Sequence, residues 1–427
     1  MIPAGSSLYT LIRTRALRSL LWLASEKVVQ LAFSALAVGL VARTLGTDAF
    51  GIFQYVLSAM MVFSSIGLIA STEVSAPRLA TCEQPQERRR LLGSLFVLRL
   101  MAGTLAFLLM GTWSLYMEPL QRQPLMLIMG LALIVIEPFN VLRLIREVAQ
   151  STRIITVTRL LVSSLKVIAV AVLYTMHAPI LAFIIVYAAD HLLTALCYLF
   201  GIREDGWPCS WRPTREVMGW FFHKGLLIWL GLVALILILR MDRLILHARL
   251  DAGLYGQYAA AMNLLDSAWY FGPVSVVALA PSLLYRAGRQ TLWSSLRLLL
   301  ILTALALLIM VGAGLLAPFI VSLIFGAGFE QTAGMFQLAL VVLVPGFAAL
   351  GLDAILIHAG NHRVVPLKWG VGLAAGAMLL VPDFGLGWHQ GPLALGVAHT
   401  VSLLAGLWFL WRMHLGRPAA AAGGPVP

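Results

Sequence analysis

Long apolar stretches separated by short polar ones constrain this chain more than any other feature. Each stretch is long enough to cross the hydrocarbon core of a bilayer, which requires about 20 mostly apolar residues in a helix. Because every backbone polar group inside a bilayer needs an internal partner, we expect these stretches to be helices. The twelve membrane-spanning helices that we predict lie at about 19–42, 50–72, 91–113, 124–142, 154–176, 178–200, 219–246, 254–284, 292–316, 333–357, 364–382 and 391–411.

The composition excludes a water-soluble globular protein. Hydrophobic residues make up 60% of the 427 residues and charged residues only 11%, which is too few to cover a soluble surface of this size. Basic residues at the cytoplasmic ends of membrane helices explain the net charge of +12 better than nucleic-acid binding does. The three cysteines have no spacing typical of a disulfide framework or a zinc site. We therefore expect an all-α polytopic membrane protein with no metal, no cofactor and no nucleic-acid partner.

The loop charges orient the predicted helices. With the N-terminus inside, 19 basic residues, Lys368 among them, fall on the cytoplasmic side and 5 on the outer side, which is the asymmetry that membrane proteins show. A missed or an extra helix would remove this asymmetry. We expect both termini in the cytoplasm, a first helix that is retained rather than cleaved as a signal peptide, and a disordered cytoplasmic tail at 413–427.

Two pairs of short segments indicate an internal repeat. DAFGIFQY (48–55) and DAGLYGQY (251–258) share four residues at a separation of 203, and APRL (76–79) matches APSL (280–283) in three residues at a separation of 204. Six helices per repeat give both halves the same orientation, related by a pseudo-twofold axis along the membrane normal around a central cavity. The segments that we predict are an N-terminal lobe at 1–200, a cytoplasmic linker at 201–218 and a C-terminal lobe at 219–412.

Three longer segments carry a family resemblance. They are VARTLGTDAFGIFQYV (41–56), MDRLILHARLDAGLYGQYAAAMNLLD (241–266) and PFIVSLIFGAGFEQTAGMFQLAL (318–340). In this order and spacing they resemble the signature regions of the polysaccharide and O-antigen flippases. These flippases belong to the multidrug/oligosaccharidyl-lipid/polysaccharide exporter superfamily.

The resemblance implies a flippase rather than an enzyme. Such a protein moves undecaprenyl-pyrophosphate-linked oligosaccharide repeat units from the cytoplasmic to the periplasmic leaflet of a bacterial inner membrane by alternating access, for the assembly of O-antigen, capsule or exopolysaccharide. The implied partners are the lipid-linked oligosaccharide, membrane lipid, and polysaccharide polymerase and chain-length proteins. The energy source stays open among H⁺, Na⁺ and the membrane potential.

Two other functions stay open at this point. A multidrug or cation exporter of the same superfamily requires a cavity with acidic rather than arginine-rich walls. A polytopic glycosyltransferase or ligase requires a long outer loop that carries catalytic groups, and no predicted outer loop is long enough.

Charged residues of the predicted seventh helix are the first candidates for a binding site, because ionisable groups in a membrane face a cavity or one another. Arg240, Arg243 and His247 lie on one face of this helix. There they suit a pyrophosphate, which accepts charge-assisted hydrogen bonds. The alternative for the two arginines is that they reach outward or pair with Asp242 and Asp251. Asp242 either belongs to the substrate site or only orients an arginine.

Further candidates lie in the other helices. Arg43 at the outer end of the first helix, and Glu26 and Lys27 two turns into it, are candidate substrate contacts, with a plain interfacial position as the alternative for Arg43. The candidates for ion coupling are Asp190, Asp266, Asp353 and Lys166.

Each of these ion-coupling candidates has a structural alternative. We favour an ion pair between Lys166 and Asp190 over a substrate role, and satisfied polar contacts inside the bundle for the other two aspartates. Arg159 lies two turns from Lys166 on the same face of the predicted fifth helix; we assign it no role from the sequence.

Overall fold

The structure, a computed structural model, describes residues 6–149, 152–200, 210–285 and 292–415, and within these ranges it consists of helices joined by short turns. The helices of the first half are α1 (Ser6–Gly67), α2 (Thr72–Ala80), α3 (Pro85–Met117), α4 (Gln123–Val148), α5 (Thr152–Thr175) and α6 (Ile180–Phe200). Those of the second half are α7 (Arg215–Leu246), α8 (Ala252–Trp269), α9 (Phe271–Ala280), α10 (Leu292–Ile324), α11 (Thr332–Ala339), α12 (Leu343–His358), α13 (Val364–Leu380) and α14 (Gln390–Leu415).

Twelve membrane crossings account for the described chain, as predicted. Ten helical segments are long and apolar enough to span a membrane, and α13 is a shorter apolar helix. The twelfth crossing comes from α1, which Gly46 divides in two with a φ of 68°. This left-handed conformation is one that glycine adopts at little cost. α8 and α9 form one crossing, interrupted only by the turn at Tyr270, and α11 and α12 form another, joined by a short 3-10 segment at Leu340–Val342.

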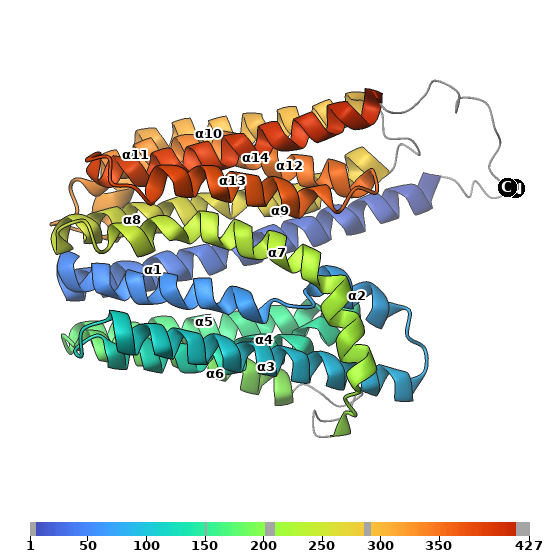
Figure 1. Ribbon diagram of the computed structural model, residues 1–427, viewed down its shortest axis with the longest axis horizontal. Coiled ribbons are helices and arrows are strands. Elements are labelled where there is room, and N and C mark those ends of the chain that lie inside the picture. Colours follow the sequence, from blue (N-terminus) through green and yellow to red (C-terminus); the bar gives the residue numbers. More distant parts are fainter. Residues whose placement is uncertain (1–5, 150–151, 201–209, 286–291, 416–427) are drawn as a thin grey trace, which may run out of the picture.

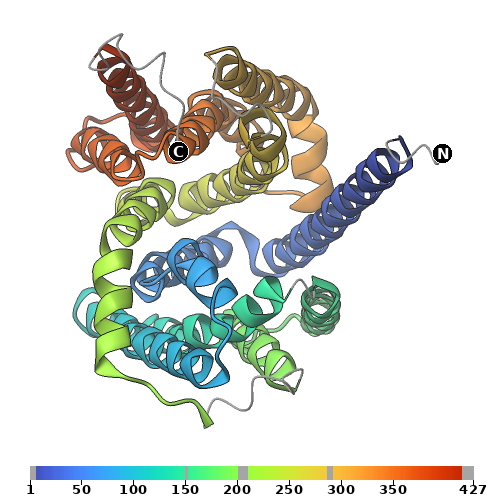
Figure 2. The same ribbon diagram turned by 90° about the vertical axis from the view of Figure 1, so that its right-hand side faces the viewer.

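The crossings lie roughly parallel to one another in two groups (Figures 1 and 2). α3 to α6 lie on one side, α8 to α14 on the other, and α1 lies between them. α1 begins and α14 ends at the same end of the bundle, on the right in Figure 1. We call this the termini end and the opposite one, where α3 turns into α4 and α7 into α8, the far end.

α7 contacts both groups. Near its middle, Trp229 donates a hydrogen bond to the Ser65 carbonyl in α1 at 2.8 Å. Slightly further along, a Cβ on Gly231 would lie 2.9 Å from Pro366 in α13, so the two backbones are in close contact there. The boundary predicted at residue 219 therefore falls inside a helix that bridges the two halves, and it stays a prediction.

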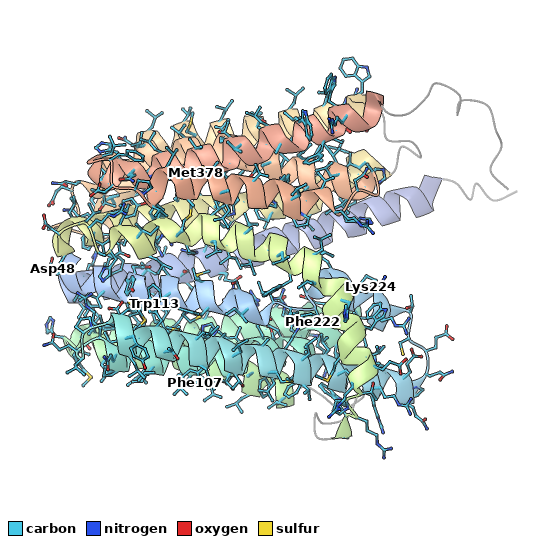
Figure 3. The ribbon with its side chains drawn as sticks, in the orientation of Figure 1. Asp48, Phe107, Trp113, Phe222, Lys224 and Met378 are labelled. Carbon is cyan, nitrogen blue, oxygen red and sulfur yellow. The ribbon has the colours of Figure 1, made fainter. Side chains whose placement is uncertain are left out.

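Apolar side chains cover the outside of the bundle. Met378 on the outer face of α13 is 73% exposed, and many large apolar side chains on α3, α5 and α10 are exposed in the same way. Figure 3 shows Asp48 at the far end and Lys224 on α7 toward the termini end, with Met378 on the outer surface between them. Such a surface is stable only against lipid. The protein is a multi-pass membrane protein.

Candidate functional site

A polar pocket of about 440 Å³ lies among the helices of the first half. Its walls come from α1, α4, α5 and α6, and Tyr270, between α8 and α9, adds a contact from the second half. The polar lining includes the side chains of Asn140, Arg143, Arg159, Lys166, Asp190 and His191. The pocket therefore lies where the first half faces the second.

The described lining of this pocket carries more positive than negative charge, with three cations and one carboxylate. The ion pair predicted between Lys166 and Asp190 is present, with 3.2 Å between Nζ and Oδ2. Arg143 donates from Nε to Glu147 Oε1 at 2.7 Å, just outside the lining. Half-buried Arg159 has neither an ion pair nor a hydrogen bond within the described part of the chain. Its guanidinium is therefore available to an anion.

Helix geometry places these cations at different depths. Arg159 lies about two turns from the start of α5 and Lys166 about four turns from it. Arg143 lies about one and a half turns before the end of α4. Because α4 ends and α5 begins at the termini end, the positive charges extend from that end toward the middle of the bundle.

The arginines of α7 are paired inside the second half instead. Arg243 donates from Nη1 to Asp266 Oδ2 at 2.7 Å and from Nη2 to Asp266 Oδ1 at 2.9 Å. Arg240 Nη1 lies 2.5 Å from Asp266 Oδ2. Both arginines thus face a neighbouring carboxylate, but that carboxylate is neither Asp242 nor Asp251. A substrate role for the two arginines, and an ion-coupling role for Asp266, stay predictions.

Asp353 lies in a second buried ion pair. Its carboxylate is 2.9 Å from Lys368 Nζ and accepts a hydrogen bond of 2.9 Å from Trp369 Nε1. Lys368 also donates to the Ala349 carbonyl at 2.8 Å, and its side chain is 0% exposed. Lys368, which was counted with the basic residues of the cytoplasmic side, lies about one turn into α13, where a carboxylate and a carbonyl satisfy its ammonium group. Its cytoplasmic side stays a prediction.

Arg43 and His247 lie at the far end, where the two halves touch. Arg43 Nη2 donates to the Leu323 carbonyl at 2.6 Å. His247 stacks on Tyr55 with 4.0 Å between ring centroids, and its Nε2 accepts a hydrogen bond of 2.7 Å from Arg122 Nη1. Burial, and then the charge of Arg122, lower the pKa of His247 to about 4, which keeps the ring neutral. These contacts join the two halves at the far end.

Three candidates remain. Asp242 is fully buried and accepts a hydrogen bond of 2.5 Å from the Tyr258 hydroxyl, so it lies in a structural contact of the second half. Glu26 and Lys27 lie in α1 about one turn before Gln30, which lines the pocket. The side chains of Glu26 and Lys27 lie outside the described ones, so their substrate role stays a prediction.

Sequence reasoning missed Arg143 and Arg159 as pocket residues. The predicted fourth helix stops at residue 142, which made Arg143 a loop charge, whereas α4 continues to Val148. A glutamate four residues after Arg143 was the available signal, since such pairs lie on one helix face. Arg159 shares a face with Lys166, but nothing in the sequence shows that this face lines a pocket.

Comparison with known proteins places this chain in a family. The sequence pattern of the family described as polysaccharide biosynthesis protein matches residues 16–283. The chain belongs to this family. Among curated proteins, no sequence matches that of the chain.

Solved structures share the fold of this polysaccharide biosynthesis protein. The lipid II flippase MurJ, in an inward closed conformation, is similar with a TM-score of 0.71 and 14% identity over 92% of this chain and 87% of that one. A multidrug resistance MATE family transporter of the MOP superfamily, in an inward-facing conformation, is similar with a TM-score of 0.68 and 14% identity over 92% and 96%. The predicted fold class, an all-α polytopic membrane protein with twelve membrane-spanning helices, is confirmed.

Proposed function

We propose that this polysaccharide biosynthesis protein is a flippase for undecaprenyl-pyrophosphate-linked oligosaccharides. The observation that carries the proposal is the cationic pocket with Arg159, which has no ion pair or hydrogen bond among the described residues. A guanidinium group binds phosphate through paired, charge-assisted hydrogen bonds, and a pyrophosphate offers several acceptor oxygens to more than one cation. Family membership supports the saccharide part of the substrate. The oligosaccharides are those used for O-antigen, capsule or exopolysaccharide.

The orientation follows from the same charges. We propose that the termini end faces the cytoplasm of a bacterial cell, because basic residues concentrate on the cytoplasmic side of inner-membrane proteins. The pocket cations then extend toward the compartment in which the substrate is assembled. The contacts of Arg43 and His247 keep the periplasmic side closed while the substrate loads. Release requires these far-end contacts to break as the two halves move.

The likeness to a MATE family multidrug transporter favours a second candidate, the export of organic cations. In the described lining of the pocket, Asp190 is the one carboxylate, and Lys166 already neutralises it. An organic cation would meet Arg159 without a free anionic partner. The charge of the lining is therefore better matched to an anion.

Transport in proteoliposomes tests the proposal. The substrate is a fluorescent disaccharide joined to an isoprenoid through a diphosphate, and its matched control carries a neutral ether in place of the diphosphate. We expect the protein to move the diphosphate lipid between leaflets, measured by quenching from outside, and to leave the ether lipid in place. Equal movement of both lipids, or efflux of a quaternary ammonium dye without lipid movement, contradicts the proposal.

A further inference from the structure

A small side pocket of about 40 Å³ adjoins the cationic pocket of the first half. Its polar lining consists of Asn140 from α4 and of His191, Thr194 and Tyr198 from α6. The first three of these residues also line the cationic pocket, so the two pockets are neighbours. A volume of this size holds a few water molecules or one small substituent of a larger ligand.

Tyr198 contributes an unpaired hydroxyl group to the side pocket. Its side chain is only 4% exposed, and within the described part of the chain its hydroxyl makes no hydrogen bond. A buried hydroxyl without a partner costs free energy, so at the wall of a pocket it favours a water molecule or a ligand that supplies the missing bond. The spacing of four residues puts Tyr198 on the same face of α6 as Thr194 and Asp190.

Two other side chains offer hydrogen-bond acceptors. Asn140 donates from Nδ2 to Glu137 Oε1 at 3.2 Å, because a carboxylate only accepts, and this leaves its amide oxygen as an acceptor. Glu137 is held in turn by Arg99, with 3.7 Å between Oε2 and Nη1, which fixes the orientation of the amide. Thr194 donates its hydroxyl hydrogen to the Asp190 carbonyl at 2.8 Å and keeps lone pairs on Oγ1. The side pocket therefore presents one hydroxyl that can donate and two oxygens that accept.

The rest of the side pocket is apolar, with walls from Val135, Ile136, Phe139 and Ala195. An acetamido group has the matching chemistry, since it combines an N–H that donates, a carbonyl that accepts and an apolar methyl group. A bare hydroxyl would leave the apolar walls unfilled. A carboxylate would bring only acceptors to the two accepting oxygens and would lie near the carboxylate of Asp190.

We propose that the side pocket is a specificity subsite for an acetamido group on the sugar that is joined to the diphosphate. This inference rests on the proposed function, since it takes the diphosphate of the lipid-linked saccharide to bind in the cationic pocket. The sugar is attached to the diphosphate through its anomeric carbon, and the substituent on the next ring carbon, C2, lies close to the phosphate. A pocket that adjoins the cationic one therefore suits the C2 substituent. Tyr198 donates to the acetamido carbonyl, and Asn140 and Thr194 accept from its N–H.

Binding of two lipids to the purified full-length protein in detergent tests the subsite. The probes are undecaprenyl diphosphates that carry either N-acetylglucosamine or glucose, so that they differ only in the C2 substituent. We expect the wild type to bind the acetamido lipid about tenfold more tightly, because the glucose hydroxyl leaves part of the polar lining of the side pocket unpaired.

Two substitutions of nearly unchanged shape locate the preference. Tyr198→Phe removes only the hydroxyl group, and Thr194→Val removes one acceptor. Each should weaken binding of the acetamido lipid about fivefold and leave binding of the glucose lipid unchanged. Thr194→Val keeps the test informative if Tyr198→Phe does not fold. The matched control is Tyr116→Phe, which removes a phenolic hydroxyl from a side chain of α3 that is 82% exposed and should keep the wild-type preference.

The outcomes separate the subsite from the proposed function. Arg159→Ala should weaken binding of both lipids by the same factor, because they share the diphosphate. Equal binding of the two lipids by the wild type, or a preference that both Tyr198→Phe and Thr194→Val keep, overturns the subsite and leaves the proposed function in place. A wild type that binds neither lipid overturns the proposed function and the subsite with it.

Discussion

Each half of the protein contains a lysine–aspartate pair between two consecutive crossings, and the two pairs differ in burial. Lys166 and Asp190 are 3.2 Å apart and about one-fifth exposed, in the wall of a pocket. Lys368 and Asp353 are 2.9 Å apart, and the lysine is wholly buried. The buried lysine has a second hydrogen-bond acceptor in a backbone carbonyl, whereas within the described chain Lys166 donates its hydrogen bond to Asp190.

This difference shows that charge alone does not mark a binding site in a membrane protein. A buried ion pair must satisfy its groups internally, because each ion loses its hydration. A pair that borders a pocket keeps part of its hydration and can exchange one partner for a ligand. The pair of Arg243 with Asp266 is intermediate, since the arginine side chain is only 2% exposed and that of the aspartate is 24% exposed. We infer that the buried charged pairs, which include Arg99 with Glu137 in the first half, hold helices together, while the charges that line the pocket are available to substrate.

The largest expected effect separates the two lysines. Lys368→Met leaves the Asp353 carboxylate buried without its cation, so we expect the protein to lose about 3–5 kcal/mol of stability. Lys166→Met should cost about 1 kcal/mol or less, because Asp190 stays in contact with water in the pocket. Thermal unfolding in detergent measures both. Equal losses would show that the two pairs contribute equally to stability and would contradict the distinction drawn between them.

A smaller effect distinguishes Arg240 from Arg243, the two arginines near the far end of α7. Arg243→Ala removes two hydrogen bonds to Asp266 but leaves Arg240 as a partner, so we expect a loss of about 3 kcal/mol. Arg240→Ala should cost about 1 kcal/mol, since it makes one contact and Asp266 keeps its better partner. Folded Arg240→Ala should bind undecaprenyl diphosphate as the wild type does. A strong loss of binding in this variant would restore the substrate role predicted for α7.

The smallest effect on stability is expected at Arg159. Because this side chain has no partner within the described chain, Arg159→Ala should change stability by about 0.5 kcal/mol or less. Thermal unfolding beside the wild type measures it. A marked loss of stability would mean that Arg159 belongs to the fold rather than to the pocket.

The fold could be predicted from the sequence because it depends on long patterns. Each of the twelve apolar stretches forms a helical crossing, since a helix pairs all of its backbone N–H and C=O groups within one segment in lipid. The contact of Lys166 with Asp190 was also predictable, because ionisable groups inside the membrane pair with opposite charges on neighbouring helices. These inferences need only periodicity and the order of the helices.

The partners in the second half required the packing of the helices. Asp242 is next to Arg243 in the chain, yet adjacent residues of a helix point in different directions. Asp266 lies in the next crossing, and only the packing of α8 against α7 brings it to Arg243. Lys368, near the start of a crossing, matches the pattern of a cytoplasmic loop charge, and only the packing of α12 against α13 brings it to Asp353. The pocket itself depends on which faces of four helices converge, and a single sequence does not contain that.

The most direct test of the central claim, that the pocket of the first half rather than the arginines of α7 holds the diphosphate, is flipping by Arg159→Ala and Arg240→Ala side by side. Both variants are reconstituted at equal amounts of folded protein and supplied with the diphosphate-linked disaccharide. The account predicts that Arg159→Ala moves the lipid-linked disaccharide between leaflets at least about tenfold more slowly than the wild type, since a charge-assisted contact is lost. Arg240→Ala should keep the wild-type rate. A wild-type rate for Arg159→Ala together with a loss in Arg240→Ala would contradict it.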